Sequence, residues 1–187
     1  MDEKTLLDIL HIAEHLKDTT RHCYTSGGRH ESVAEHSWRL CLFAWLLRDE
    51  FPQLDMDKVL YMCLIHDLGE AFTGDIPSFK KTAADSLHED KTLFNWVSTL
   101  PEPYRTDMTA LYKEMNALEN GEAKLYKALD KLEAVIQHNE SPLDTWLPLE
   151  YELNLTYANE NVAFSSYLTS LRAMIREDTE RKIAEGH

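Results

Sequence analysis

The sequence is poor in basic residues, in glycine and in proline. Among its 187 residues, Lys and Arg number 19 against 33 Asp and Glu, which gives a formal net charge of −14 at pH 7. This balance argues against a protein that coats nucleic acid or binds an anionic membrane, since both functions need a positive surface. Glycine and proline occur six times each, too seldom for a loop-rich sandwich or a low-complexity chain.

Cysteine is scarce as well, and long apolar runs are missing. Cys23, Cys41 and Cys63 lie far apart and form no Cys-x-x-Cys pair. Such an odd, scattered set is typical of reduced thiols and not of a disulfide framework or a structural zinc site. No apolar run approaches the ~20 residues that span a bilayer, and residues 1–10 lack the pattern of a signal peptide. We therefore expect a cytoplasmic protein whose partners include no nucleic-acid polymer and no membrane.

What the sequence does contain is helical periodicity in most segments. Apolar residues recur at spacings of three and four over residues 3–17, 86–98, 104–117, 122–139 and 160–183. Ser32 to Glu35 form a capping box that begins a further helix, and another helix ends near Gly69. Residues 71–80 are expected to form a loop. The sequence predicts an all-α fold of six or more helices around one core, with a single domain over residues 1–187.

The residues that point most clearly to chemistry are His66 and Asp67, adjacent at the end of a strongly apolar helix. Burying a carboxylate there without a partner would cost several kcal/mol, roughly the penalty for an uncompensated charge. A metal cation would remove that cost, with one nitrogen and one oxygen as ligands. His36 and Asp130 stand in similar settings, each on another predicted helix.

Each of these residues also has an ordinary explanation. A His-Asp dipeptide arises often by chance, His36 could be a hydrogen-bonded helix residue, and Asp130 could pair with Lys127 or Lys131. The ordered set of His, His-Asp and Asp favours a metal site, because facing helices of a bundle can bring such ligands to one point. Trp38 and Trp45, seven residues apart on the helix of His36, are expected to pack in the core.

The ordered set His36, His66-Asp67 and Asp130 resembles that of the HD-domain metal-dependent phosphohydrolases. The segments 31–37, 66–70, 74–77 and 128–133 are similar to those of the branch that contains the bacterial 5′-deoxynucleotidases. The resemblance covers about residues 15–140 and implies an HD-type helical bundle. It also implies one divalent metal ion, which these four residues would bind. Nitrogen and carboxylate ligands accept Mn, Co, Zn, Fe, Ni or Mg, so the sequence does not identify the metal.

The same resemblance implies roles for four more residues. Glu70 corresponds to the glutamate that assists the attacking water, and Asp75 to an aspartate that contributes to the site. These roles are chemically coherent, since a carboxylate can take the proton of a water or protonate a leaving alkoxide. Arg21 corresponds to the arginine that contacts substrate, and a guanidinium suits phosphate oxygens. His22 follows it where the deoxynucleotidases carry a tryptophan, so we expect weaker discrimination against ribose.

The resemblance thus implies a metal-dependent phosphomonoesterase that converts (deoxy)nucleoside 5′-monophosphates to nucleoside and phosphate, and it favours a homodimer. Two alternatives stay open. One is a phosphodiesterase or pyrophosphohydrolase that acts on a cyclic nucleotide or an alarmone. The other is a catalytically silent module that binds nucleotide or a partner protein. The match at residues 74–77 favours the monoesterase, and the intact ligand set with Glu70 argues against the silent module.

Overall fold

The computed structural model describes residues 1–186, and it confirms the predicted all-α fold. The helices are α1 (Glu3–Glu14), α2 (Val33–Leu46), α3 (Met56–Ile65), α4 (Glu70–Thr73), α5 (Ala83–Val97), α6 (Tyr104–Ala117), α7 (Gly121–Glu140), α8 (Glu150–Thr156), α9 (Asn159–Val162) and α10 (Ser166–Glu185). Short 3-10 turns lie at η1 (His15–Lys17), η2 (Arg48–Glu50) and η3 (Leu143–Thr145). Within residues 1–186, no helix is long and apolar enough to cross a membrane.

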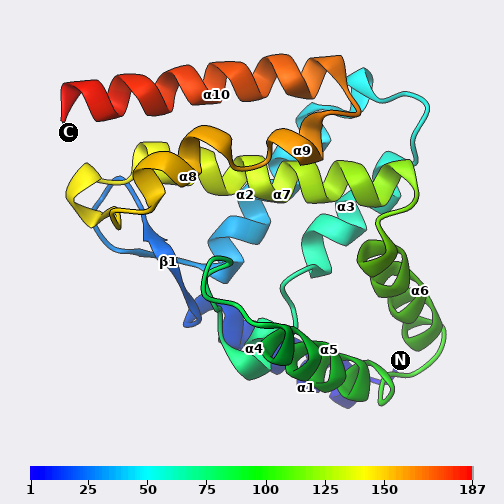
Figure 1. Cartoon of the computed structure of the whole chain (residues 1–187). Coiled ribbons are helices and arrows are strands. Elements are labelled where there is room, and N and C mark those ends of the chain that lie inside the picture. The colour runs from blue at the N-terminus through cyan, green and yellow to red at the C-terminus, as the bar shows by residue number, and fades with distance from the viewer. Residues whose placement is uncertain (187) are drawn as a thin grey trace.

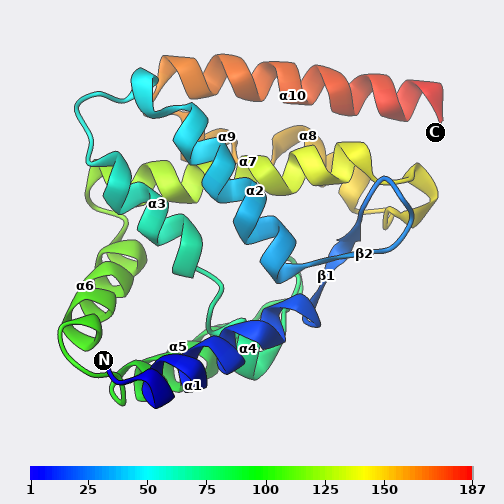
Figure 2. The same cartoon turned by 180° about the vertical axis from the view of Figure 1, so that it is seen from behind.

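The centre of the fold is formed by α2, α3 and α7, which contact one another. Figure 2 shows α2 and α3 crossing α7, while α10 runs along the outer side of α7. Leu40, Met62 and Leu129, one from each central helix, are fully buried. Each such side chain stabilises the fold by about 1.5–3 kcal/mol through the apolar surface that it removes from water. These central helices also carry the predicted metal ligands, so the core positions the site.

The starts of two central helices follow from their local sequence. The Ser32 hydroxyl accepts a hydrogen bond from the backbone N–H of Glu35, and the Glu35 carboxylate accepts one from the N–H of Ser32. This capping box, predicted from the sequence, fixes the first turn of α2. The side chain of Asn120 caps α7 by accepting from the N–H of Ala123. Helix α2 therefore begins three residues before His36, which places that imidazole about one turn inside the helix.

The structure differs from the sequence prediction where elements are short. Strands β1 (Thr20–Tyr24) and β2 (His30–Ser32) form an antiparallel hairpin in a stretch that shows no alternating pattern. Helix α4 overlaps the start of the expected 71–80 loop, and α8 lies between two predicted helices, in a stretch where no helix is predicted. Helices of four to seven residues are too short to be stable alone, so tertiary contacts and not local periodicity determine them. Figure 1 shows α4 beside α1 and α5, at the opposite side of the molecule from α10.

The prediction that Trp38 and Trp45 pack in the core is wrong. Their exposed fractions are 67% and 49%. The buried face of α2 instead carries His36, Leu40 and Ala44, which lie one helical turn apart. A residue two positions from His36 points roughly half a turn away from that face. The tryptophans therefore lie on the outer surface of α2.

Candidate metal centre and active site

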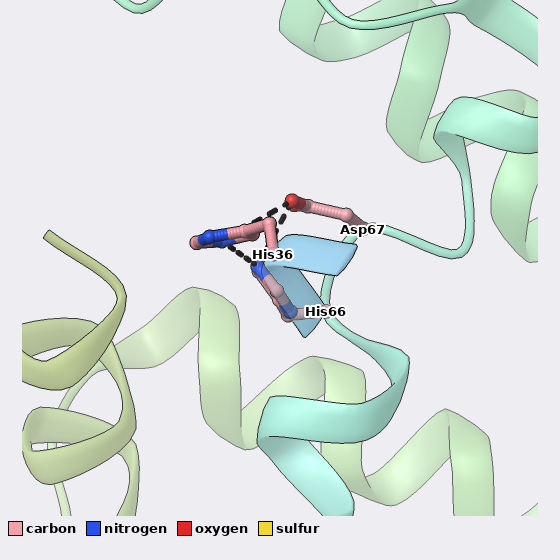
Figure 3. A group of neighbouring side chains, drawn as sticks. All are labelled: His36, His66 and Asp67. Carbon is pink, nitrogen blue, oxygen red and sulfur yellow. Dashed lines mark hydrogen bonds and ion pairs between the residues drawn. The ribbon is translucent and has the colours of Figure 1, made fainter. Parts of the chain in front are cut away.

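The three central helices bring the predicted ligands together, and Figure 3 shows three of them, His36, His66 and Asp67. His36 lies in the first turns of α2, His66 and Asp67 directly follow α3, and Asp130 lies in the middle of α7. His36 Nε2 lies 3.2 Å from His66 Nε2 and 3.2 Å from Asp130 Oδ1. His66 Nε2 lies 2.9 Å from Asp67 Oδ2. His36, His66 and Asp67 thus offer ligand atoms within 4.8 Å of one another, and Asp130 Oδ1 lies near both imidazoles.

The hydrogen bonds at the far side of each imidazole orient the ring. His66 Nδ1 donates to the backbone oxygen of Cys63 at 2.9 Å, and His36 Nδ1 donates to the Glu133 carboxylate. Because Nδ1 holds the proton of each neutral ring, the Nε2 atoms both carry a lone pair and face one another. Such facing lone pairs need a proton or a cation between them. A divalent cation with nitrogen and carboxylate ligands fits this arrangement.

The charges at the site also favour a bound cation. Burial lowers the pKa of His36, but its hydrogen bonds with Asp130 and Glu133 outweigh burial and raise this pKa to about 9. Burial raises the pKa of Asp67, but the neighbouring imidazoles of His66 and His36 lower it further than burial raises it. Asp67 is therefore ionised at neutral pH. An environment that attracts a proton to His36 in this way also attracts a metal cation.

The alternative pairing of Asp130 with a lysine is also present. Lys127 Nζ donates to Asp130 Oδ2 at 2.8 Å, and this charge helps to hold the pKa of Asp130 well below its usual range despite burial. The two explanations are compatible, because a carboxylate has two oxygens. Oδ2 pairs with Lys127, and Oδ1 faces the imidazoles of His36 and His66 at 3.2 and 3.7 Å.

Behind His36 lies a buried carboxylate, Glu133, whose role the sequence analysis did not identify. It is 1% exposed and accepts from Arg39 Nε at 2.5 Å and from His36 Nδ1. Burial raises its pKa, but the hydrogen bond with His36 and the charges of Arg21 and Arg39 lower it to about 2. The available signal was its spacing, since Glu133 lies three residues after Asp130 and shares its helix face.

Glu133 also belongs to a second cluster of potential ligands, with Glu31 and His36. Arg21 occupies this cluster, because its guanidinium lies 3.1 Å from Glu31 Oε2 and 3.5 Å from Glu133 Oε2. The negative charge of both glutamates is thus compensated by arginine. The cluster positions Arg21 and His36 and is not a second metal centre.

We expect Glu133→Gln to weaken metal binding about 10- to 100-fold, the usual effect of removing a carboxylate that orients a ligand histidine. The amide can still accept a hydrogen bond, but it no longer supplies the charge that favours a proton on Nδ1. Isothermal titration with Mn²⁺ or Zn²⁺ on chelator-stripped protein measures the change. Glu140→Gln is the matched control, since Glu140 also pairs with Arg39 but at the surface. Equal affinities for Glu133→Gln and the unmodified protein would show that Glu133 has no such role.

The expected catalytic and substrate residues line one cavity of about 210 Å³ beside the ligands. Arg21, Glu70 and Asp75 all contribute to its wall, together with Asp67 and Asp130. The volume suits a small molecule and not a polymer. Arg21 and its neighbour His22 both face the cavity although they are consecutive on β1, where the register with β2 is irregular. Such irregularities re-aim side chains and are common beside active sites.

The carboxyl groups in this cavity have unusual environments. Glu70 begins α4 and is 5% exposed, and its Oε2 has no hydrogen-bond partner in the described part of the chain. Burial and the charges of Asp67 and Asp75 raise the pKa of Glu70 to about 10. Burial also raises the pKa of Asp75, partly opposed by Arg21. A cation at Asp67 would oppose the repulsion that raises the pKa of Glu70, so Glu70 can be ionised when the centre is filled.

His22 also lines this cavity, beside a buried carboxylate that the sequence analysis did not foresee. Its Nε2 lies 3.1 Å from Oε1 of the buried Glu150, at the start of α8. Its ring meets the ring of Phe79 edge to face, with centroids 5.5 Å apart. His138 and Asn154 complete this end of the cavity. Their positions in α7 and α8 gave no signal in the sequence, because each contact joins segments distant along the chain.

Comparison with known proteins gives a consistent result. A family model described as HD domain matches residues 13–172. The chain is similar to 5′-deoxynucleotidase HDDC2 of Homo sapiens, with 29% identity over 141 residues that cover 73% of this chain and 68% of that protein. Its identity to 5′-deoxynucleotidase HDDC2 of Mus musculus is 30% over 139 residues, 72% of this chain and 69% of that protein.

Solved structures are similar over nearly the whole chain. A conserved hypothetical protein from Pyrococcus furiosus has a TM-score of 0.72 and 31% identity, covering 91% of this chain and 99% of that one. A protein described as a predicted metal-dependent phosphohydrolase from Magnetospirillum magnetotacticum has a TM-score of 0.79 and 24% identity. The match covers 96% of this chain and 95% of that one. At that identity, the second likeness concerns the fold alone.

Proposed function

The chain belongs to the HD domain family, and from that membership we propose that it is a metal-dependent phosphohydrolase that converts nucleoside 5′-monophosphates to nucleoside and phosphate. The observation that carries this proposal is the cluster of His36, His66, Asp67 and Asp130 beside one small cavity, which the Arg21 guanidinium and two further carboxyl groups line. The similarity to curated 5′-deoxynucleotidases supports the substrate class. A small cavity also favours a monophosphate over a polymeric diester.

In this proposal, His36, His66, Asp67 and Asp130 hold one divalent cation, for which Mn, Co, Zn, Fe, Ni and Mg are all candidates. When bound, such an ion lowers the pKa of water towards ~7 and polarises a phosphoryl oxygen. Glu133 and the Cys63 carbonyl keep the Nε2 lone pairs directed inward by accepting the Nδ1 protons. The protein therefore supplies oriented ligands before the cation arrives.

The remaining residues bind the phosphate and move protons. Arg21 binds phosphate oxygens, and its pairing with Glu31 at 3.1 Å holds the guanidinium in place. Glu70 orients the attacking water and takes its proton through the carboxyl oxygen that has no partner of its own within residues 1–186. Asp75, whose raised pKa favours a retained proton, protonates the leaving 5′-oxygen or aligns the nucleophile.

Phosphate release from a panel of deoxyribo- and ribonucleoside 5′-monophosphates tests the proposal. Chelator-stripped protein is assayed with each candidate metal, and nucleoside 3′-monophosphates, a cyclic nucleotide and a pyrophosphate serve as comparison substrates. Preferential release from the 5′-monophosphates is expected. Faster hydrolysis of the diester or pyrophosphate would favour the phosphodiesterase alternative, and absence of turnover with every metal would favour the silent module.

We expect deoxyribo- and ribonucleotides to differ in kcat/KM by less than about 100-fold, and His22→Trp to widen that gap. A tryptophan would present an apolar wall to the sugar, where a 2′-hydroxyl without a partner costs ~1–3 kcal/mol. His22 offers a polar ring, which Glu150 and Phe79 hold at the cavity wall. Paired kinetics on dAMP and AMP measure the ratio. A strong deoxy preference that His22→Trp leaves unchanged would show that His22 does not face the sugar.

We further infer that the protein is a cytoplasmic homodimer with one domain over residues 1–187. The outer face of α2 supports the dimer, because Trp38, Leu42, Trp45 and Leu46 are all exposed, and Leu64 of the neighbouring α3 is 60% exposed. Contiguous exposed apolar groups of this kind often mark a protein–protein interface. Sedimentation equilibrium gives the native mass, and a monomer at micromolar concentration would contradict the inference.

A further inference from the structure

Three buried polar atoms at the end of the cavity away from the metal ligands have no hydrogen-bond partner among residues 1–186. They are Glu150 Oε1, His138 Nδ1 and Asn154 Nδ2, and all three residues line the cavity that contains Arg21. Glu150 is fully buried and Asn154 is 3% exposed. Buried polar atoms without partners are rare in folded proteins, and each requires an explanation such as a water or a ligand.

The surroundings of Glu150 hold its carboxylate in one orientation. Its Oε2 accepts from the backbone N–H of Leu147 at 2.6 Å, which directs Oε1 towards the histidines. Oε1 lies 3.1 Å from His22 Nε2 and 3.6 Å from His138 Nε2, but neither contact has hydrogen-bond geometry. Burial lowers the pKa of His138 to about 4, so this imidazole is neutral and offers one donor and one acceptor. The carboxylate therefore remains short of donors.

The position of this cluster relative to the metal ligands is set by α7. His138 follows Asp130 by eight residues on that helix, which corresponds to about 12 Å. This separation is comparable to the length of a nucleoside monophosphate from its phosphate to the far edge of its base. The cavity wall also includes the apolar side chains of Val135, Leu153 and Phe79. The cavity thus offers polar groups near Asp130 and near His138, and apolar side chains in the same wall.

We propose that Glu150, His138 and Asn154 form a subsite for the hydrogen-bonding edge of the nucleobase. This inference rests on the proposed function and extends it to the part of the substrate that does not react. The Glu150 carboxylate accepts an N–H of the base, and Asn154 Nδ2 donates to a ring nitrogen or carbonyl oxygen. The apolar side chains of the cavity wall contact the faces of the sugar and the base. Glu150 Oε1 and Asn154 Nδ2 thereby gain the partners that they lack.

The test compares a nucleotide with a substrate that lacks the base. Each dNMP and 2′-deoxyribose 5-phosphate are assayed with the unmodified protein, Glu150→Gln, Asn154→Asp and the control Glu152→Gln, which alters an exposed residue of the same helix. We expect the unmodified protein to prefer at least one nucleotide over the sugar phosphate. Glu150→Gln and Asn154→Asp should reduce that preference about 10-fold, and Asn154→Asp should change kcat/KM for the sugar phosphate less than about 3-fold.

A second measurement does not depend on turnover. The inhibition constant of the product nucleoside should rise about 10-fold in Asn154→Asp, a variant of unchanged volume that keeps the fold testable if Glu150→Gln does not fold. Equal losses for the nucleotide and the sugar phosphate, or an unchanged ratio and an unchanged inhibition constant, would overturn the proposal and leave water as the partner of these atoms. Failure of the proposed function is distinguishable, because the unmodified protein would then hydrolyse none of the 5′-monophosphates.

Discussion

The Asp67→Ala variant is expected to bind no divalent metal and to release no phosphate above background. Asp67 supplies the oxygen that lies closest to His66 Nε2, at 2.9 Å, and without it the two imidazole lone pairs have only Asp130 as an anionic neighbour. Removing one partner from a buried charged cluster leaves the remaining charges uncompensated, and this costs more free energy than the intact pairing contributes to stability. Elemental analysis of the purified variant and a phosphate-release assay measure the two losses separately.

Asp90→Ala is the matched control for this experiment, since Asp90 is an exposed aspartate of α5 and the same side chain is removed. That variant should keep both the metal and the activity. Circular dichroism of Asp67→Ala should remain helical, because the change removes charge and not apolar core. If Asp67→Ala retained stoichiometric metal and full turnover, the assignment of Asp67 as a ligand would be wrong.

Glu70→Ala is expected to keep the metal and to lose at least ~10²-fold in kcat, the usual scale for a group that moves a proton in the transition state. Glu70 lies one turn after the ligands His66 and Asp67, and one of its carboxyl oxygens has no partner within residues 1–186. This oxygen is therefore available to take a proton from water. KM should change little, because Arg21 and not Glu70 binds the phosphate. Steady-state kinetics at saturating metal, with metal content measured on the same sample, test this expectation.

The control is Glu119→Ala, which removes an exposed glutamate from the turn before α7. Its kcat should equal that of the unmodified protein. Loss of metal from Glu70→Ala would make Glu70 a ligand, and an unchanged kcat would remove it from the chemistry.

Those parts of the molecule that depend on local pattern could be predicted from the sequence. Helix α6 occupies residues 104–117 as expected, and the capping box of Ser32 and Glu35 begins α2 as expected. Both features depend on residues within a few positions of one another. The proximity of His36 to His66 and Asp130 required more, namely the idea that three apolar helix faces meet in one core.

The residues that were missed act over long distances in the sequence. Arg39 and Glu133 are 94 positions apart and form an ion pair, and no local pattern encodes such a contact. Glu150 gave no signal because its neighbour His22 lies on a strand that the periodicity did not reveal. The exposed Trp38 was misplaced for a related reason. Residue type and the spacing of seven from Trp45 suggested the core, whereas the buried face of α2 is the one that carries His36.

Helix α7 sets a fixed distance between the candidate metal centre and the proposed nucleobase subsite. It carries Asp130 at one point and His138 two turns later, and a packed helix neither stretches nor shortens. One residue inserted between them would turn His138 by about 100° around the helix axis relative to Asp130. The two sites therefore fit a substrate of only one length. The free-energy changes caused by mutations more than ~10 Å apart usually add, because the two sites share no partners. Exchange of the segment that carries Glu150 and Asn154 would therefore change which nucleoside is accepted and leave the hydrolytic centre intact.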